Sequence, residues 1–102
     1  MRIVTSKRLR QFGMAYADAR QALEDWETRT AAARWRNLAQ TRSTFVSADE
    51  VVVKSGKPVM VFSIRGNRYR LITAIHYNTG VVYVMRFLTH AEYNKDDWKK
   101  TL

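Results

Sequence analysis

The fold class is decided by three runs of residues: Val59-Met60-Val61-Phe62-Ser63-Ile64, Tyr69-Arg70-Leu71-Ile72-Thr73-Ala74-Ile75-His76-Tyr77 and Val81-Val82-Tyr83-Val84-Met85-Arg86-Phe87-Leu88. All of them are rich in β-branched and aromatic residues, which is the composition of strands. The segments between them contain Gly66-Asn67 and Asn78-Thr79-Gly80, and Gly and Asn tolerate the positive φ angles of tight hairpin turns. The second half of the chain is therefore predicted to be an antiparallel meander of about three or four strands.

The first half of the chain has the spacing of helices instead. Leu9, Phe12 and Tyr16 recur at helical intervals after Thr5-Ser6, whose hydroxyls are expected to cap the first helix. Asp18 is expected to cap a second helix, with Gln21 completing a capping box. A third, short helix is predicted over residues 33–41, and a short strand over residues 1–4. The residues that these helices are predicted to bury include Ala19, Leu23, Trp26, Thr30, Trp35 and Leu38.

Helices followed by a meander of strands predict an α+β domain. Its N-terminal helices should pack on one face of a small, mainly antiparallel sheet and leave the other face free. The length suits a single domain over residues 1–102. Because strand side chains alternate between faces, the predicted groups are Arg70, Ile72, Ala74 and His76 on the central strand, and Val82, Val84, Arg86 and Leu88 on the last. Arg70 and Arg86 are therefore expected to lie in one groove on the uncovered face.

The composition excludes several classes of site. The chain has no cysteine and only two histidines, so a structural zinc site is not expected, and no other metal or cofactor is predicted. No apolar run approaches the roughly 20 residues of a membrane-spanning helix, and the charged start of the sequence lacks the apolar core of a signal peptide. We expect a cytoplasmic protein that does not bind membranes.

The charge distribution indicates a polyanionic partner. The net charge is +9, and no acidic residue lies between Glu50 and Glu92. The lysines and arginines of that interval are Lys54, Lys57, Arg65, Arg68, Arg70 and Arg86. A sheet from which only positive charges project is expected to bind nucleic acid.

Two segments of this basic half carry a more specific signal. The first is Phe62-Ser63-Ile64-Arg65-Gly66-Asn67-Arg68-Tyr69-Arg70-Leu71-Ile72, and the second is Leu88-Thr89-His90-Ala91-Glu92-Tyr93-Asn94-Lys95. Together with the opening Ser6-Lys7-Arg8-Leu9-Arg10 and with Trp35-Arg36-Asn37, they resemble the HigB-type toxins of the RelE superfamily. The sequence differs at Ser63, Arg65 and Asn94, where family members usually carry Asn, Gly and Asp.

The resemblance implies a RelE-like fold and the toxin component of a type II toxin–antitoxin system. Such toxins are mRNA interferases, endoribonucleases that cut messages, usually on the translating ribosome, and so inhibit translation. The 2′-hydroxyl of one nucleotide attacks its own 3′ phosphate, and no metal or other cofactor takes part. The resemblance also implies a helix-turn-helix antitoxin, similar to HigA, as a partner.

This chemistry needs a base, an acid and cations around the phosphorane, and the two segments contain candidates for each role. His90 is a candidate for either proton transfer, because histidine titrates near neutral pH. Arg70 offers a planar guanidinium to phosphate oxygens. Tyr93, one helical turn after His90, is a candidate proton donor or a platform for a stacked base. The predicted RNA-binding residues are Lys57, Arg65, Asn67, Arg68, Arg86 and Lys95.

Two other functions stay open on the sequence alone. The same basic face would serve a non-catalytic RNA-binding module, which should tolerate the loss of His90. It would also serve a protein-interaction domain whose groove receives an acidic peptide, and such a domain would neither bind nor cut RNA. Two residues near the motifs are predicted to have structural roles, with His76 packing in its strand and Glu92 orienting an arginine.

Overall fold

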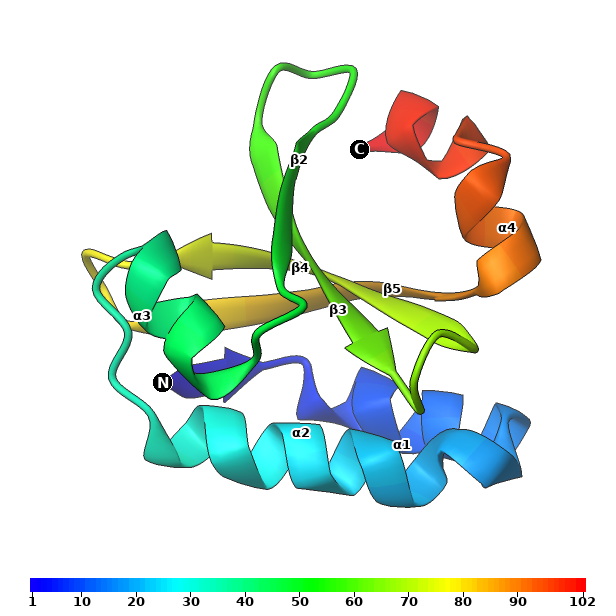
Figure 1. Ribbon diagram of the computed structural model, residues 1–102, viewed down its shortest axis with the longest axis horizontal. Helices are drawn as coiled ribbons and strands as arrows, with labels where there is room; N and C mark the ends of the chain where they lie inside the picture. Colours follow the sequence, from blue (N-terminus) through cyan, green and yellow to red (C-terminus); the bar gives the residue numbers. More distant parts are fainter.

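The structure, a computed structural model, describes residues 1–102 and is built on one five-stranded sheet (Figure 1). The strands are β1 (Arg2–Val4), β2 (Asp49–Val52), β3 (Pro58–Ile64), β4 (Tyr69–His76) and β5 (Val81–Thr89). Their order across the sheet is β1-β5-β4-β3-β2. β1 is parallel to β5, and all other neighbours are antiparallel. The predicted antiparallel meander and the short N-terminal strand are both confirmed.

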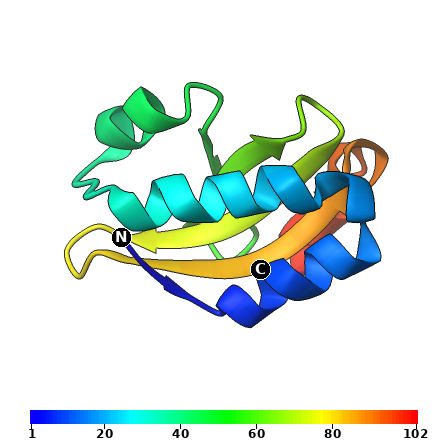
Figure 2. The same cartoon turned by 90° about the horizontal axis from the view of Figure 1, so that it is seen from below.

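The helices α1 (Ser6–Ala15) and α2 (Arg20–Ala32), joined by the 3₁₀ helix η1 (Ala17–Ala19), form a layer on one face of this sheet. Figure 2 looks onto that layer and shows both helices in front of the strands of the sheet. The remaining helices are α3 (Leu38–Thr44), α4 (His90–Asn94) and the 3₁₀ helix η2 (Asp97–Thr101). None of the helices has the length and apolar character that crossing a bilayer requires. The predicted α+β class is confirmed, with N-terminal helices packed on one face of a mainly antiparallel sheet.

The main hydrophobic core lies between the helical layer and the sheet and contains 14 buried residues. Trp26 of α2 is 1% exposed and meets the Phe62 ring of β3 edge-on, with ring centroids 5.3 Å apart. Trp35 stacks on the same Phe62 ring at 6.2 Å. Aromatic side chains bury large apolar areas, so these contacts stabilise the attachment of the helices to the sheet.

The first two helices begin differently from the prediction. Thr5 has a φ of 71° and does not cap α1, because its hydroxyl accepts a hydrogen bond from the Val84 N–H at 3.1 Å and lies 3.0 Å from the Val84 carbonyl oxygen. Asp18 lies within η1 and makes no capping hydrogen bond. Its carboxylate is bound instead by Arg65 and Tyr69, which are distant in the sequence. Both predicted caps were wrong because long-range partners replaced the local backbone.

The third helix also begins later than predicted. The Asn37 side chain accepts a hydrogen bond from the Gln40 N–H at 2.9 Å and so fixes the start of α3 at Leu38. Trp35 precedes the helix and is buried, as predicted, while Leu38 is only half-buried. In the β3–β4 turn, positive φ angles occur at Arg65 and Gly66 rather than at Gly66 and the residue after it.

β5 contains a bulge that strict alternation did not predict. Ile72 pairs with Arg86 and Thr73 pairs with Val84, so Met85 is an extra residue on β5. A bulge of this kind reverses which face the following side chains occupy. Val84 and Phe87 therefore lie in the same main core, although alternation placed them on opposite faces.

The bulge also determines where the arginines of the sheet lie. Cross-strand partners in an antiparallel sheet share a face, and the register pairs Arg86 with Ile72 and Leu88 with Arg70. Arg70 and Arg86 are thus on the same face of the sheet, away from α1 and α2. This part of the prediction is confirmed.

The second face was predicted to be free. In the structure the C-terminal segment partly covers it, so this part of the prediction was wrong. Trp98 of η2 is 5% exposed and packs in a second cluster with Val53, Val59, Val61 and Ile72. Figure 1 shows α4 and η2 folding back toward the β2–β3 hairpin. At the tip of that hairpin, the Lys54 N–H donates to the Lys99 carbonyl at 3.0 Å. Residues 95–102 are mostly polar and charged, so the sequence does not indicate that Trp98 packs against the sheet.

Candidate active site

Arg70 and Tyr93, two of the three predicted catalytic residues, meet on the second face of the sheet. Arg70 projects from β4, and its guanidinium carbon lies over the Tyr93 ring, 5.4 Å from the ring centroid. One guanidinium nitrogen of Arg70 donates to the carbonyl oxygens of Asn67 at 3.1 Å and Tyr69 at 3.2 Å. These bonds orient the half-buried guanidinium and leave its other N–H groups for an anion.

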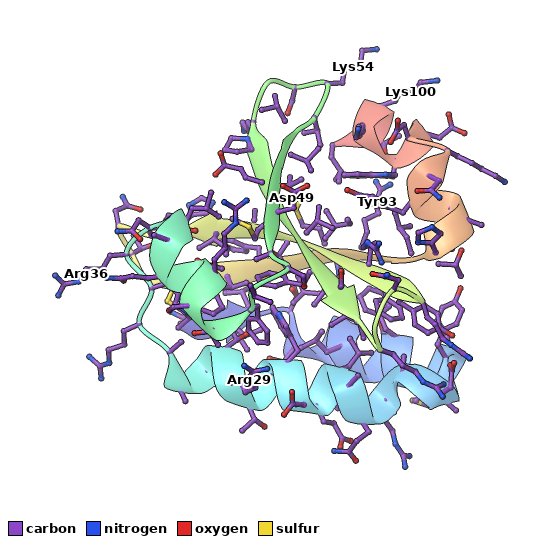
Figure 3. The ribbon with its side chains drawn as sticks, in the orientation of Figure 1. Arg29, Arg36, Asp49, Lys54, Tyr93 and Lys100 are labelled. Atoms are coloured by element: carbon purple, nitrogen blue, oxygen red, sulfur yellow. The ribbon has the colours of Figure 1, made fainter.

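Tyr93 is held in place by the C-terminal segment. The Trp98 ring stacks on it, with centroids 5.3 Å apart and an interplanar angle of 21°, and the Trp98 indole N–H donates to the Tyr93 carbonyl at 3.1 Å. Burial, followed by the charge of Asp49, raises the pKa of the Tyr93 hydroxyl. This hydroxyl is therefore protonated at neutral pH and able to donate a hydrogen bond. Figure 3 shows Tyr93 directed toward the β2–β3 hairpin, which carries Asp49.

His90, the third predicted catalytic residue, is the first residue of α4 and adjoins the β3–β4 turn. Its backbone N–H donates to the Arg68 carbonyl at 2.9 Å, and its imidazole is exposed. The start of the helix is a capping box in which the Thr89 hydroxyl accepts from the Glu92 N–H and the Glu92 carboxylate accepts from the Thr89 N–H. The predicted role of Glu92 in orienting an arginine was wrong, because its carboxylate caps α4 instead.

Arg86 and Lys95, from the predicted RNA-binding set, line an open hollow of about 340 Å³ beside these residues. Arg86 is half-buried on β5, and Lys95 forms the C-terminal cap of α4. The hollow is also bordered by Glu92 and Asp97, so its charge is mixed. The structure therefore brings Arg86 and Lys95 together, next to the element that carries His90 and Tyr93.

Arg65 and Arg68 are drawn toward the helical layer by Asp18. The Asp18 carboxylate accepts from Arg65 at 2.7 Å and from the Tyr69 hydroxyl at 2.7 Å, and it lies 3.6 Å from an Arg68 guanidinium nitrogen. The hydrogen bond from Tyr69, and then the nearby Arg65 charge, hold the pKa of Asp18 below its usual value. The same carboxylate raises the pKa of Tyr69. Asp18 thus neutralises part of the charge that the turn presents and anchors the turn to η1.

Lys57 and His76 lie away from this group. Lys57 is in the β2–β3 turn and borders a separate hollow of about 430 Å³ that His76 also lines. The exposed His76 ring meets Tyr83 edge-on, with centroids 5.1 Å apart, a contact that agrees with its predicted packing role. Asn67 is exposed in the β3–β4 turn, close to Arg70 through its carbonyl oxygen.

Three residues that shape the site were not among the predicted site residues: Asp18, expected only as a helix cap, Asp49, and Trp98, expected only to anchor the C-terminal tail. Asp49 pairs with Val61, so it lies on the second face, and its charge contributes to the raised pKa of Tyr93. Alternation along β2 could have placed Asp49 on the second face of the sheet. An isolated tryptophan in a charged tail indicates a buried anchor, which is what Trp98 is. Nothing in the sequence near Asp18 indicates its partners. No group of three or more His, Cys, Asp or Glu side chains is arranged to hold a metal ion.

The α+β fold, with a helical layer on one face of a mainly antiparallel five-stranded sheet, is compatible with the class of RelE-like toxins. A sequence model of the HigB_toxin family, described as the RelE-like toxic component of a toxin–antitoxin system, matches residues 19–96. This match covers most of the chain, so the protein belongs to that family. No curated protein matches the sequence. The protein is therefore the toxin of a toxin–antitoxin system, and its family implies an antitoxin as partner.

Proposed function

We propose that this toxin is a metal-independent endoribonuclease that cleaves mRNA on the translating ribosome and so inhibits translation. The observation that carries the proposal is the contact of Arg70 with Tyr93 on α4, the helix that begins at His90. It supplies a cation for phosphate and two groups able to transfer protons. Cleavage by an internal hydroxyl needs these groups in one place.

In the proposed reaction the 2′-oxygen of one nucleotide attacks the adjacent phosphorus, and the bond from that phosphorus to the next 5′-oxygen breaks. A base takes the proton of the 2′-hydroxyl, and an acid gives a proton to the 5′-oxygen. The products are a 2′,3′-cyclic phosphate and a 5′-hydroxyl. Arg70 stabilises the charge of the phosphorane, because the guanidinium N–H groups not used by backbone carbonyls are free to bind its oxygens.

His90 and Tyr93 divide the proton transfers in this proposal. The Tyr93 hydroxyl donates, because a phenol is protonated at neutral pH and the pKa of this one is raised further by burial. His90 accepts the 2′ proton, since a neutral imidazole has a ring nitrogen that can accept one and this side chain is exposed to solvent. The ring of Tyr93 is stacked on Trp98 and lies under Arg70, so we assign its function to the hydroxyl rather than to stacking on a base.

The RNA would follow the cations that adjoin this group. Arg86 and Lys95 border one hollow, and Arg68 and Asn67 lie in the turn that contacts α4. The pairing of Arg65 with Asp18 reduces its contribution, and Lys57 would contact only a longer strand. A cytoplasmic helix-turn-helix antitoxin, similar to HigA, would hold the toxin inactive.

The ends of the products test this mechanism. Purified toxin would be incubated with free RNA and with ribosomes carrying a message, and the ends of the fragments identified. We expect a cyclic or 3′ phosphate and a 5′-hydroxyl. Fragments with a 3′-hydroxyl and a 5′-phosphate would contradict attack by the 2′-oxygen. Binding without cleavage of either substrate would instead favour the non-catalytic RNA-binding module.

A further inference from the structure

A second group of arginines lies in the segment between α2 and α3, where Arg34 and Arg36 flank Trp35. The Trp35 side chain is 4% exposed, and its indole N–H donates to the Thr44 hydroxyl at 2.9 Å. The backbone on either side is extended, with φ −86° and ψ 162° at Ala33 and φ −162° and ψ 175° at Asn37. Alternate residues of an extended chain point to the same side. With Trp35 anchored in the core, Arg34 and Arg36 are both presented to solvent.

Arg2 of β1 joins these arginines around an open hollow of about 470 Å³, which Tyr77 and Gly80 also line. We call Arg2, Arg34 and Arg36 the distal arginine patch. No acidic residue borders this hollow. The ion pairs of the protein involve other cations, namely Arg29, Arg42, Arg65, Arg68, Lys99 and Lys100. The distal arginine patch therefore keeps its full positive charge.

The patch is separate from the candidate active site. Figure 3 shows Arg36 projecting from the left edge of the molecule, whereas Tyr93 lies on the other side of the β2–β3 hairpin, beside the C-terminal helices. The principal extents of the domain are 31 × 31 × 23 Å, so one RNA strand of modest length could contact both regions. The proposed cleavage mechanism does not use any arginine of the distal arginine patch.

We propose that the distal arginine patch is a second RNA-binding surface, which grips phosphates of an RNA segment outside the cleavage groove. This inference rests on the proposed function, since it takes RNA as the ligand. Guanidinium groups bind phosphate oxygens through paired N–H donors, and the buried Trp35 fixes the backbone that carries Arg34 and Arg36, so this backbone need not be ordered on binding. RNA fits better than an acidic peptide because a continuous phosphate backbone supplies several anions to three cations that lie together.

The test compares two variants of equal charge. One carries Arg2→Gln, Arg34→Gln and Arg36→Gln, and the control carries Lys7→Gln, Arg10→Gln and Arg20→Gln, which are exposed cations on and after α1. Dissociation constants are measured against salt concentration for a long and a short single-stranded RNA. The 2′-hydroxyls of both probes are methylated, so the 2′-oxygen cannot attack, and binding is measured independently of cleavage. Circular dichroism checks that both variants are folded.

We expect the patch variant to bind the long probe at least about tenfold more weakly than the control, with a log–log salt slope shallower by about 2, because three phosphate contacts are lost. The short probe, which fills only the groove, should bind both variants equally. Equal weakening of both variants would overturn the proposal in favour of a general charge effect. Weakened binding of the antitoxin, with unchanged binding of the long probe, would overturn it in favour of a protein partner.

The outcome is separable from that of the proposed function. If the wild-type toxin fails to cleave any RNA but the patch variant alone loses affinity for the long probe, the second surface stands and the endonuclease proposal fails. If cleavage proceeds with cyclic phosphate products and the patch variant binds the long probe as tightly as the control, the distal surface is wrong and the endonuclease stands.

Discussion

The two faces of the sheet differ in how completely they are buried and in whether they carry charged side chains. The face under α1 and α2 belongs to a cluster of 14 buried residues, whereas the opposite face forms a cluster of five around Trp98. Arg70 and Arg86 lie on the opposite face and are only half-buried. Burying an unpaired charge is costly, so a face that carries arginines has to stay partly open. The helical face therefore stabilises the domain, and the incompletely covered face has the access to solvent that a ligand needs.

The largest expected effect is on stability, from a substitution under the helices. Trp26→Ala removes a side chain that is 1% exposed and that contacts both Phe45 and Phe62. We expect the free energy of unfolding to fall by about 3–5 kcal/mol, as for other buried tryptophans. That is a large part of the roughly 5–15 kcal/mol typical of a domain. Urea denaturation followed by circular dichroism measures it.

Met14→Ala is the matched control on the same helical layer. Met14 is 83% exposed, so its loss should change the free energy of unfolding by less than about 0.5 kcal/mol. A cost for Trp26→Ala as small as that for Met14→Ala would show that the helical face does not hold the domain together.

The second largest effect is expected on the cleavage rate, from a substitution of His90 beside the partly open face. His90→Ala should lower the cleavage rate by roughly 10²–10⁴-fold, the usual range for a lost general acid or base. Because the imidazole is exposed, stability should be almost unchanged. His76→Ala is the control, since it removes an exposed histidine that packs on Tyr83. Single-turnover cleavage rates, together with growth on induced expression, measure the difference; equal toxicity of the two variants would leave His90 without a catalytic role.

A smaller effect on the cleavage rate is expected from Tyr93→Phe, which tests the role of the hydroxyl separately from that of the ring. Tyr93→Phe keeps the stack on Trp98 and the contact with Arg70 but removes the proposed proton donor. We expect cleavage to slow by about 10²-fold with no change in stability. Tyr83→Phe, which removes the hydroxyl of an exposed ring that packs on His76 away from the site, is the control for loss of a phenol. An unchanged rate in Tyr93→Phe would mean that the ring, as a support for Arg70, is what matters.

The sequence predicted the parts of this comparison that depend on local pattern. Helical spacing located α1 and α2, and β-branched runs located β3 to β5. The two motif segments singled out Arg70 and Tyr93, which are in contact, and His90; the catalytic roles of all three stay predictions. The bulge at Met85 was missed, because an extra residue in a strand leaves no mark on a run of β-branched and aromatic residues. Simple alternation therefore failed after Val84.

Contacts between distant segments were the other failure. Asp18 has the composition and position of a helix cap, but its partners Arg65 and Tyr69 lie 47 and 51 residues away in the sequence. Arg65 was predicted to bind RNA from its charge alone, and no local property of the chain indicates that a carboxylate will reach it. The packing of Trp98 against the second face is also a contact between distant segments, because it depends on how the chain turns after α4.

The smallest expected effect concerns Asp18, which links the two faces by anchoring the β3–β4 turn to the helical layer. Its pKa is lowered in the folded protein, so the stabilisation it provides is present above the ordinary pKa of aspartate and is lost as pH falls through the lowered value. Asp18→Asn should therefore destabilise the protein slightly at neutral pH, and the gap from wild type should close as the pH falls below the ordinary pKa of aspartate, about 3.9. Urea midpoints across this range measure it, with Asp25→Asn, which removes the exposed pairing with Arg29, as the control. A gap that stays constant with pH would show that the Asp18 charge does not stabilise the turn, and that the two faces are coupled only through packing.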